Sequence, residues 1–273
     1  MKNSRLQYAK HPIRQPGTNL YMSTKDPNIT VAVRSLPISL YPPARHFFVV
    51  MSLLFLIISV VGFVPSYQAM YAGTRKFPIH WIAHVHGALM TSWLLVFITQ
   101  TILAAKGHLK FHRQLGLFSV ALGVLIWISM WIASARALIG FNPPLDHFLF
   151  DVLIIQFYGI VLFGFFFTWG ILERKNAAVH KRLLFLSTVV LMQAGIDRMH
   201  WLPGLHMTLS IRFFYLDSLL IPLFIYDWIV LKRIHKVTWI GTLLFIVLQV
   251  TVTMVWGSPA WHNFWFNLKN LFL

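Results

Sequence analysis

The chain has 273 residues, of which 58% are hydrophobic and 11% are charged, and its formal net charge is +16. This composition lies outside the range of soluble globular domains and predicts a protein that crosses a membrane several times. The absence of cysteine excludes disulfides, thiolate-bound iron–sulfur clusters and covalently attached c-type haem, so His and carboxylate side chains remain as the strong metal ligands.

Residues 1–45 form a basic N-terminal segment without an apolar stretch after its charged start, which is not the pattern of a cleavable signal peptide. We expect this segment to lie in the cytoplasm near anionic lipid headgroups. A disordered tail without a role is the alternative interpretation. Its basic residues are Lys2, Arg5, Lys10, Arg14, Lys25, Arg34 and Arg45.

A membrane-spanning helix needs about 20 mostly apolar residues. Seven windows meet this requirement: 46–68, 79–105, 112–139, 147–172, 180–199, 211–232 and 237–257. The sequence therefore predicts an all-α polytopic membrane helix bundle, with one seven-helix transmembrane domain over residues 46–273. Within it, helices two to five, residues 79–199, are expected to form a core four-helix bundle.

Most of the 23 Lys and Arg residues fall in the N-terminal segment and in the connections after the second, fourth and sixth windows. Because Lys and Arg stay on the cytoplasmic side of a bilayer, we expect the N-terminus inside and the C-terminus outside, in the inner membrane of the cell. This placement indicates that the basic residues interact with lipid and not with nucleic acid. The aromatic stretch 256–266 is then expected at the outer interface.

This topology sorts the polar residues near the helix ends into two layers. An ionisable side chain in a spanning helix usually faces the bundle interior and serves a site. The outer layer contains His80, His84, His86, His147, Asp151, Asp197, Arg198, His200, His206 and Asp217. The inner layer contains His112 and His180. The remaining histidines are expected at the surface: His11, His46, His108, His235 and His262.

The two layers alternate along helices two to five: outer, inner, outer, inner. In an antiparallel four-helix bundle the diagonal partners are two with four and three with five, so each diagonal supplies two histidines at one depth. That is the ligand arrangement of a b-type haem held by two imidazoles. Basic side chains lie near both layers and are candidates to meet haem propionates. They are Arg136, Arg198 and Arg212 outside and Arg113, Lys181 and Arg182 inside.

The stretch His86-Gly-Ala-Leu-Met90-Thr-Ser-Trp93 resembles the His-Gly-x-Leu-Met-x-x-Trp opening of cytochrome b561-type proteins. The basic, glycine-containing starts His112-Arg-Gln-Leu-Gly116 and His180-Lys-Arg182 are similar to other ligand positions of that family, and the alternating order agrees. The resemblance covers residues 80 to 200.

This resemblance implies a diheme transmembrane electron-transfer protein. His86 and His147 would bind the outer haem, and His112 and His180 the inner one. A quinone, another electron donor or acceptor and further membrane subunits are the partners that such a protein would use. The chain departs from the family in having more helices and no glycine motif after His147. A second likeness, of residues 62–67 to unnamed bacterial multi-helix proteins, carries no function.

A non-haem metal centre in the outer layer is the main alternative. His80 and His84 share one helical face at i and i+4, and His147 and Asp151 repeat that spacing. Such ligands suit iron, copper or zinc, in oxygen chemistry or hydrolysis when one coordination position stays open. The candidate ligands are His80, His84, His86, His147, Asp151, Asp197 and His200.

A third class is a non-enzymatic membrane subunit, assembly factor or transporter whose histidines respond to pH. The sequence does not decide among the three classes. It leaves open whether the protein is an enzyme, with an oxidoreductase as the activity that the metal-containing alternatives permit.

Overall fold

A computed structural model describes residues 14–15, 18–19, 42–74, 80–139 and 147–272, with side chains described for 45–74, 80–136 and 148–268. The chain divides into two compact units, Met1–Arg45 and His46–Leu273. In the first unit β1 (Arg14–Gln15) and β2 (Thr18–Asn19) pair antiparallel, with Arg14 opposite Asn19. Residues 42–45 of the predicted basic segment begin a helix, and its residues 1–13, 16–17 and 20–41 lie outside the described residues.

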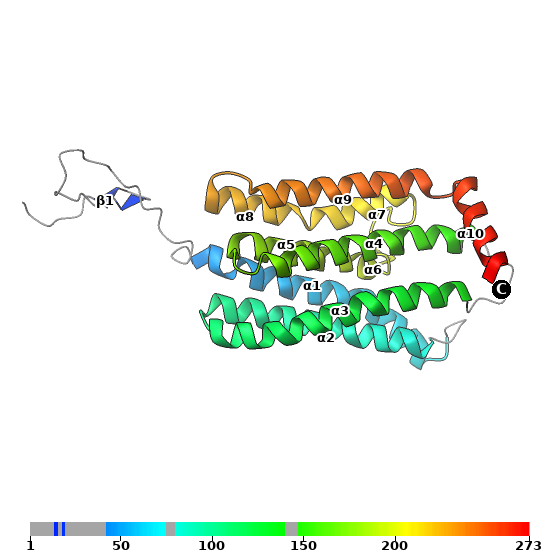
Figure 1. Cartoon of the computed structure of the whole chain (residues 1–273), viewed down its shortest axis with the longest axis horizontal. Helices are drawn as coiled ribbons and strands as arrows, with labels where there is room; N and C mark the ends of the chain where they lie inside the picture. Colours follow the sequence, from blue (N-terminus) through cyan, green and yellow to red (C-terminus); the bar gives the residue numbers. More distant parts are fainter. Residues whose placement is uncertain (1–13, 16–17, 20–41, 75–79, 140–146, 273) are drawn as a thin grey trace, which may run out of the picture. The chain divides into compact units, whose positions relative to one another are not determined.

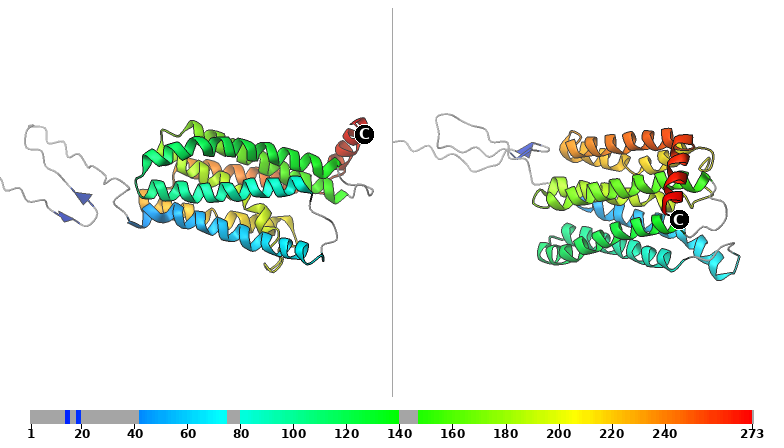
Figure 2. Two further views of the ribbon diagram at one scale, coloured as in Figure 1. Left: turned by 90° about the horizontal axis from the view of Figure 1, so that it is seen from below. Right: turned by 45° about the vertical axis from the view of Figure 1, so that its right-hand side comes forward.

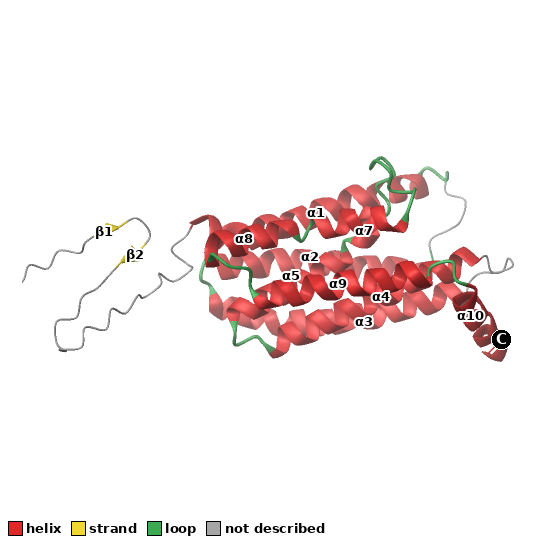
Figure 3. Ribbon diagram, turned by 90° about the horizontal axis from the view of Figure 1, so that it is seen from above, coloured by secondary structure: helices red, strands yellow, loops and turns green. Residues whose placement is uncertain are grey.

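The second unit consists mainly of helices, drawn in red in Figure 3. They are α1 (Pro42–Tyr71), α2 (Trp81–Ala105), α3 (Leu109–Ile139), α4 (His147–Leu172), α5 (Ala177–Leu191), α6 (Gln193–Ile196), α7 (Leu209–Ser218), α8 (Ile221–Leu231), α9 (Lys236–Val255) and α10 (Pro259–Phe272).

Seven stretches of the described chain are long and apolar enough to cross a membrane. They are Arg45–Tyr71, Trp81–Ala105, Leu109–Arg136, Phe148–Leu172, Ala177–Ile196, Leu209–Leu231 and Lys236–Val255. The prediction of an all-α, seven-helix, multi-pass membrane protein is therefore confirmed.

Local chemistry fixes several helix ends. Side chains accept free backbone N–H groups in the first turns of four helices: His80 at α2, Asn176 at α5, Thr208 at α7 and His235 at α9. Gly107 turns the chain between α2 and α3 with a φ of +77°, a conformation that suits glycine. Such short turns make consecutive helices antiparallel neighbours.

The long helices run side by side along one axis (Figure 1). α2 packs on α3, α3 on α4 and α4 on α5, and α9 covers α4 and α5. The indole N–H of Trp93 in α2 donates to Thr188 Oγ1 of α5 over 3.2 Å, which joins the first and last helices of the core. The Trp93 ring also meets Phe163 and Phe167 of α4 edge-on at 5.8 and 5.7 Å. Large aromatic side chains thus fill the interior between α2, α4 and α5.

α1 closes one side of this core, along the flank of the bundle shown in Figure 2. Its Ser52 hydroxyl lies 3.1 Å from the Thr101 hydroxyl of α2, and Phe55 packs on Phe185 of α5. A Cβ on Gly62 would lie 2.3 Å from the carbonyl oxygen of Gly195, so the two backbones approach too closely for any side chain at position 62. Close helix packing thus accounts for the glycine of the 62–67 motif.

The sixth span is not the single helix predicted over 211–232. α7 ends at Ser218 and α8 begins at Ile221, because Pro222 has no amide N–H to bond the carbonyl of Ser218 and its ring opposes a regular helix. After the seventh span, a turn at Gly257 (φ +72°) leads into α10, which crosses the end of the bundle (Figure 1, red).

Candidate functional site

His112 of α3 and His180 of α5 lie beside each other at one end of the bundle. Their ring centroids are 6.4 Å apart and their planes are perpendicular, at 90°. Both residues lie in the first turn of their helices. We call this end the basic end; it carries the turns 106–108, 173–176 and 232–235. The structure therefore brings together the two inner histidines, from the diagonal helices predicted.

Backbone carbonyls orient both rings. His180 Nδ1 lies 2.7 Å from the carbonyl oxygen of Gly170 in α4, and His112 Nδ1 lies 3.3 Å from that of Gln100 in α2. Because a carbonyl oxygen only accepts hydrogen bonds, each Nδ1 carries the hydrogen, and each neutral ring keeps a lone pair on Nε2. No side chain or backbone group in the described ranges bonds to either Nε2. Metal-binding histidines share this pattern, with the second ring nitrogen donating to a carbonyl.

Gln100 adds a polar side chain next to the histidine pair. Its Nε2 donates to Ser119 Oγ over 3.0 Å, whereas its Oε1 is buried and has no hydrogen-bond partner among the described residues. Gly116 leaves space on the facing helix, where a Cβ would lie 3.7 Å from Gln100 Nε2. A buried acceptor without a donor is costly, so this oxygen marks a position where a ligand or water would gain a hydrogen bond.

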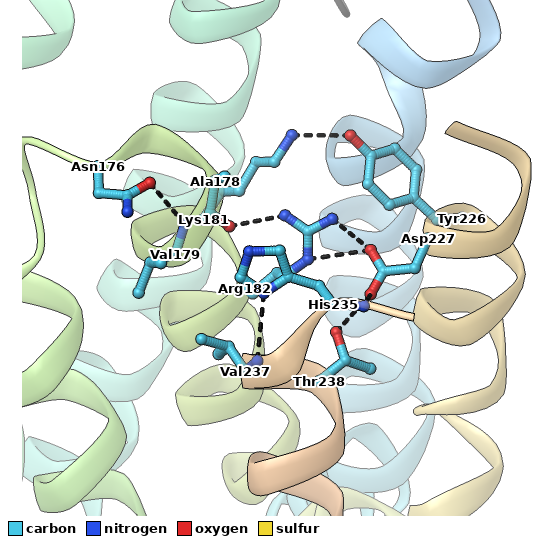
Figure 4. A network of polar contacts seen from close by, with 10 residues as sticks. All are labelled: Asn176, Ala178, Val179, Lys181, Arg182, Tyr226, Asp227, His235, Val237 and Thr238. Carbon is cyan, nitrogen blue, oxygen red and sulfur yellow. Dashed lines mark hydrogen bonds and ion pairs between the residues drawn. The ribbon is translucent and has the colours of Figure 1, made fainter. Parts of the chain in front are cut away.

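Arg182, which the sequence predicts to meet a haem propionate, has its guanidinium group bonded within the protein. Its Nε and Nη2 donate to Asp227 Oδ1 and its Nη1 donates to the carbonyl of Ala178 (Figure 4). Thr238 Oγ1 and the backbone N–H of His235 bond to the other carboxylate oxygen over 2.6 and 3.0 Å. The guanidinium is therefore buried and paired within a network that joins α5, α8 and α9.

Lys181 belongs to the same network. Its Nζ donates to the Tyr226 hydroxyl over 2.7 Å and lies 5.1 Å from the Phe48 ring centroid. Arg113, in contrast, is exposed one residue after His112. Arg113 is therefore a basic residue beside the inner pair whose side chain can reach an anionic group.

His86 of α2 lies at the opposite end of the core and faces α3. Its Nδ1 is 2.8 Å from Ser129 Oγ, and that hydroxyl donates its hydrogen to the carbonyl of Ile126 over 2.7 Å. The serine therefore accepts from His86, which again leaves the lone pair on Nε2. His147 begins α4, but its side chain lies outside the described residues, and so does the predicted His86–His147 pair.

The other outer candidates do not gather around one point. His80 caps α2, with its Nδ1 accepting from the Ile82 N–H over 3.3 Å, and His84 lies against the Tyr67 ring at 6.1 Å. Asp151 Oδ1 accepts from the Gly257 N–H over 2.8 Å and lies 2.9 Å from His262 Nε2. The described residues contain no group of three or more His, Asp or Glu side chains placed to hold a metal ion.

His262 is not the surface residue expected from the sequence. Its side chain is 12% exposed and pairs with Asp151. Trp261 Nε1 donates to the carbonyl of Phe150 over 2.6 Å, and the Trp265 ring stacks on Phe157 at 5.6 Å. The C-terminal aromatic stretch thus anchors α10 on α4.

Asp197 and His200 also bond elsewhere. Gln193 Nε2 donates to Asp197 Oδ1 over 2.7 Å, and His200 Nδ1 lies 2.7 Å from His206 Nε2. Burial raises the pKa of Asp197, an effect that the Gln193 bond and nearby Arg212 partly oppose. Arg198 lies over the Phe63 ring at 4.3 Å, and Arg136 is exposed near the end of α3.

Sequence reasoning missed Asp227 and Ser129. Asp227 could have been noticed, because a carboxylate inside an apolar window needs a partner. Nothing in the local sequence singles out Ser129.

No protein-family model, curated protein or solved structure matches this chain. The likeness to cytochrome b561-type proteins therefore depends on the motifs around His86, His112 and His180 alone.

Proposed function

We propose that this chain is an integral membrane electron-transfer protein that binds b-type haem, with His112 and His180 as axial ligands at the basic end. The observation that carries the proposal is the perpendicular imidazole pair, 6.4 Å between centroids, with both Nδ1 atoms bonded to backbone carbonyls. Haem would supply one-electron redox chemistry at this position.

The 6.4 Å between the two ring centroids is close to the separation expected for two imidazoles that would bind one metal ion. With metal–nitrogen bonds of about 2.0–2.1 Å, such imidazoles have ring centroids about 6 Å apart. The carbonyls of Gln100 and Gly170 hold the rings in the tautomer that ligation requires. Exposed Arg113 is positioned by sequence to meet a propionate, since guanidinium and carboxylate groups bond strongly.

A second haem at the opposite end would use His86, with His147 as the candidate partner from α4. Ser129 orients His86 as the carbonyls orient the inner pair. Along α2, His86, Trp93 and Gln100 follow at intervals of seven residues, so they share one face, with about 10 Å of helix rise between successive residues. The buried Trp93 ring therefore lies between the two levels.

The proposed orientation of the protein in the membrane follows from the charge distribution. Lys and Arg concentrate in the turns of the basic end, and the positive-inside tendency assigns that end to the cytoplasm of the cell's inner membrane. In this orientation electrons would pass between an outer and an inner site. A quinone or a partner membrane subunit is the class of molecule that would exchange them.

One sample tests the proposal. The purified protein should show a reduced-minus-oxidised absorption spectrum of b-type haem, and elemental analysis of the same sample should give iron and no stoichiometric copper or zinc. A colourless protein that contains only copper or zinc would instead support the non-haem alternative.

A further inference from the structure

A polar cluster separate from the histidines joins α4, α7 and α9. Gln249 Nε2 donates to Asp217 Oδ1 over 2.8 Å and to the Tyr158 hydroxyl over 3.1 Å. Tyr158 and Gln249 are buried. The amide of Gln249 therefore links a tyrosine and a carboxyl group inside a part of the protein that spans the membrane.

Asp217 lies where the sixth span is interrupted. The end of α7 is closed by i−3 bonds, from the Leu219 N–H to Leu216 and from the Leu220 N–H to Asp217, and α8 starts after them. This interruption is at the centre of Leu209–Leu231, about 16 Å from either end at 1.5 Å per residue, which is near the middle of a ~30 Å hydrocarbon core.

Helix interruptions at this depth are a feature of ion sites. The C-terminal end of a half-helix carries partial negative charge on its unpaired carbonyls, and these favour a bound cation. At the end of α7 the carbonyl of Ser218 has no amide donor from Pro222. The carboxyl group of Asp217 thus lies at the C-terminal end of α7, where the backbone carbonyls already carry partial negative charge.

No basic side chain in the described ranges balances Asp217. The ion pairs found there are Arg182–Asp227 and His262–Asp151. The groups that face Asp217 are the Tyr158 hydroxyl from α4 and the Gln249 amide from α9, and both are neutral. A carboxyl group in such surroundings must be paired, ligated or protonated.

We propose that Asp217 is a proton-binding site of the membrane domain, in which the carboxylate takes up one proton to become a carboxylic acid and releases it again. Gln249 donates to Oδ1, so Oδ2 is the oxygen that carries the proton. The side chain is partly exposed at the interrupted helix. The site needs no haem, so this proposal is independent of the electron-transfer proposal.

Infrared spectroscopy of the purified full-length protein at neutral pH tests the site. We expect the carbonyl stretching band of a protonated carboxylic acid, shifted in heavy water, which disappears in Asp217→Asn. Asp151→Asn is the matched control, because that carboxylate pairs with His262, and it should retain the band. Absence of the band in the native protein, or its persistence in Asp217→Asn, would overturn the proposal.

Two further measurements test whether the band belongs to Asp217 and whether the site binds a proton or sodium. Gln249→Leu keeps Asp217 but removes the hydrogen bond to its Oδ1, so the band should move to higher frequency; an unmoved band contradicts the assignment even if Asp217→Asn does not fold. Thermal stability in sodium chloride should equal that in choline chloride. Stabilisation by sodium that Asp217→Asn abolishes would show a sodium site in place of a proton site.

Discussion

Arg182 and Asp227, 45 residues apart in the chain, form an ion pair whose side chains are 1% and 0% exposed. The pair ties α5 to α8, and the same carboxylate bonds the start of α9 through the His235 N–H and Thr238. Desolvation of two charges offsets much of their attraction, but a partner left alone bears its full desolvation cost. The intact pair therefore adds little to stability, but the loss of one member is strongly destabilising.

Arg182→Ala and Asp227→Ala should each lower the free energy of unfolding by about 3–5 kcal/mol, because each leaves an unpaired buried charge. The double variant Arg182→Met with Asp227→Leu should lose less than either single variant. Denaturant unfolding in detergent micelles measures all three. Single variants within about 1 kcal/mol of the native protein would contradict this account.

Acid should weaken the start of α9 through His235. Its Nδ1 accepts from the Val237 N–H, and burial lowers the pKa of His235 below 6.5. As pH falls, His235 therefore binds a proton in the unfolded chain before it does so in the folded protein. The stabilisation by neutral His235 is present above pH 6.5 and is lost as pH falls toward the pKa of His235 in the folded protein.

His235→Ser tests this dependence, because serine accepts the same capping bond and does not titrate. The thermal midpoint of the native protein should fall more steeply below pH 6.5 than that of the variant. Parallel curves would exclude a contribution from this imidazole.

Asp151 should hold α10 against the bundle. Asp151→Ala removes the bonds to His262 and to the Gly257 N–H, so limited proteolysis at the α9–α10 turn should accelerate about tenfold, as expected for hydrogen bonds to a charged group. Glu173→Ala, in the turn between α4 and α5, is the control and should leave this cleavage unchanged. Equal rates for the two variants would show that α10 is held by its aromatic contacts alone.

Ser129→Ala should weaken haem binding at the His86 end about 10- to 100-fold, the usual effect of losing a group that orients a metal ligand. Titration of the haem-free protein with haem measures the affinity. Ser134→Ala is the matched control, since that buried serine of α3 bonds to the Met130 carbonyl. Equal affinities in the two variants would remove Ser129 from the site.

The spans and the inner pair followed from the sequence, because apolar windows of membrane length and alternating helix direction determine which ends meet. The pairing of His112 with His180 required only that logic. Contacts between distant segments did not follow: Asp151 and His262 are 111 residues apart, and no local pattern predicts their meeting. The interruption in the sixth span had a local signal in Pro222, which hydropathy alone does not register.

Haem content of histidine variants tests the central claim most directly. His112→Ala and His180→Ala should each lose the same haem component from the reduced-minus-oxidised spectrum, while His86→Ala loses a different one. His108→Ala, an exposed histidine of the same basic end, should retain both. If His112→Ala and His180→Ala keep the native spectrum, or if the native protein contains no haem, the account is contradicted.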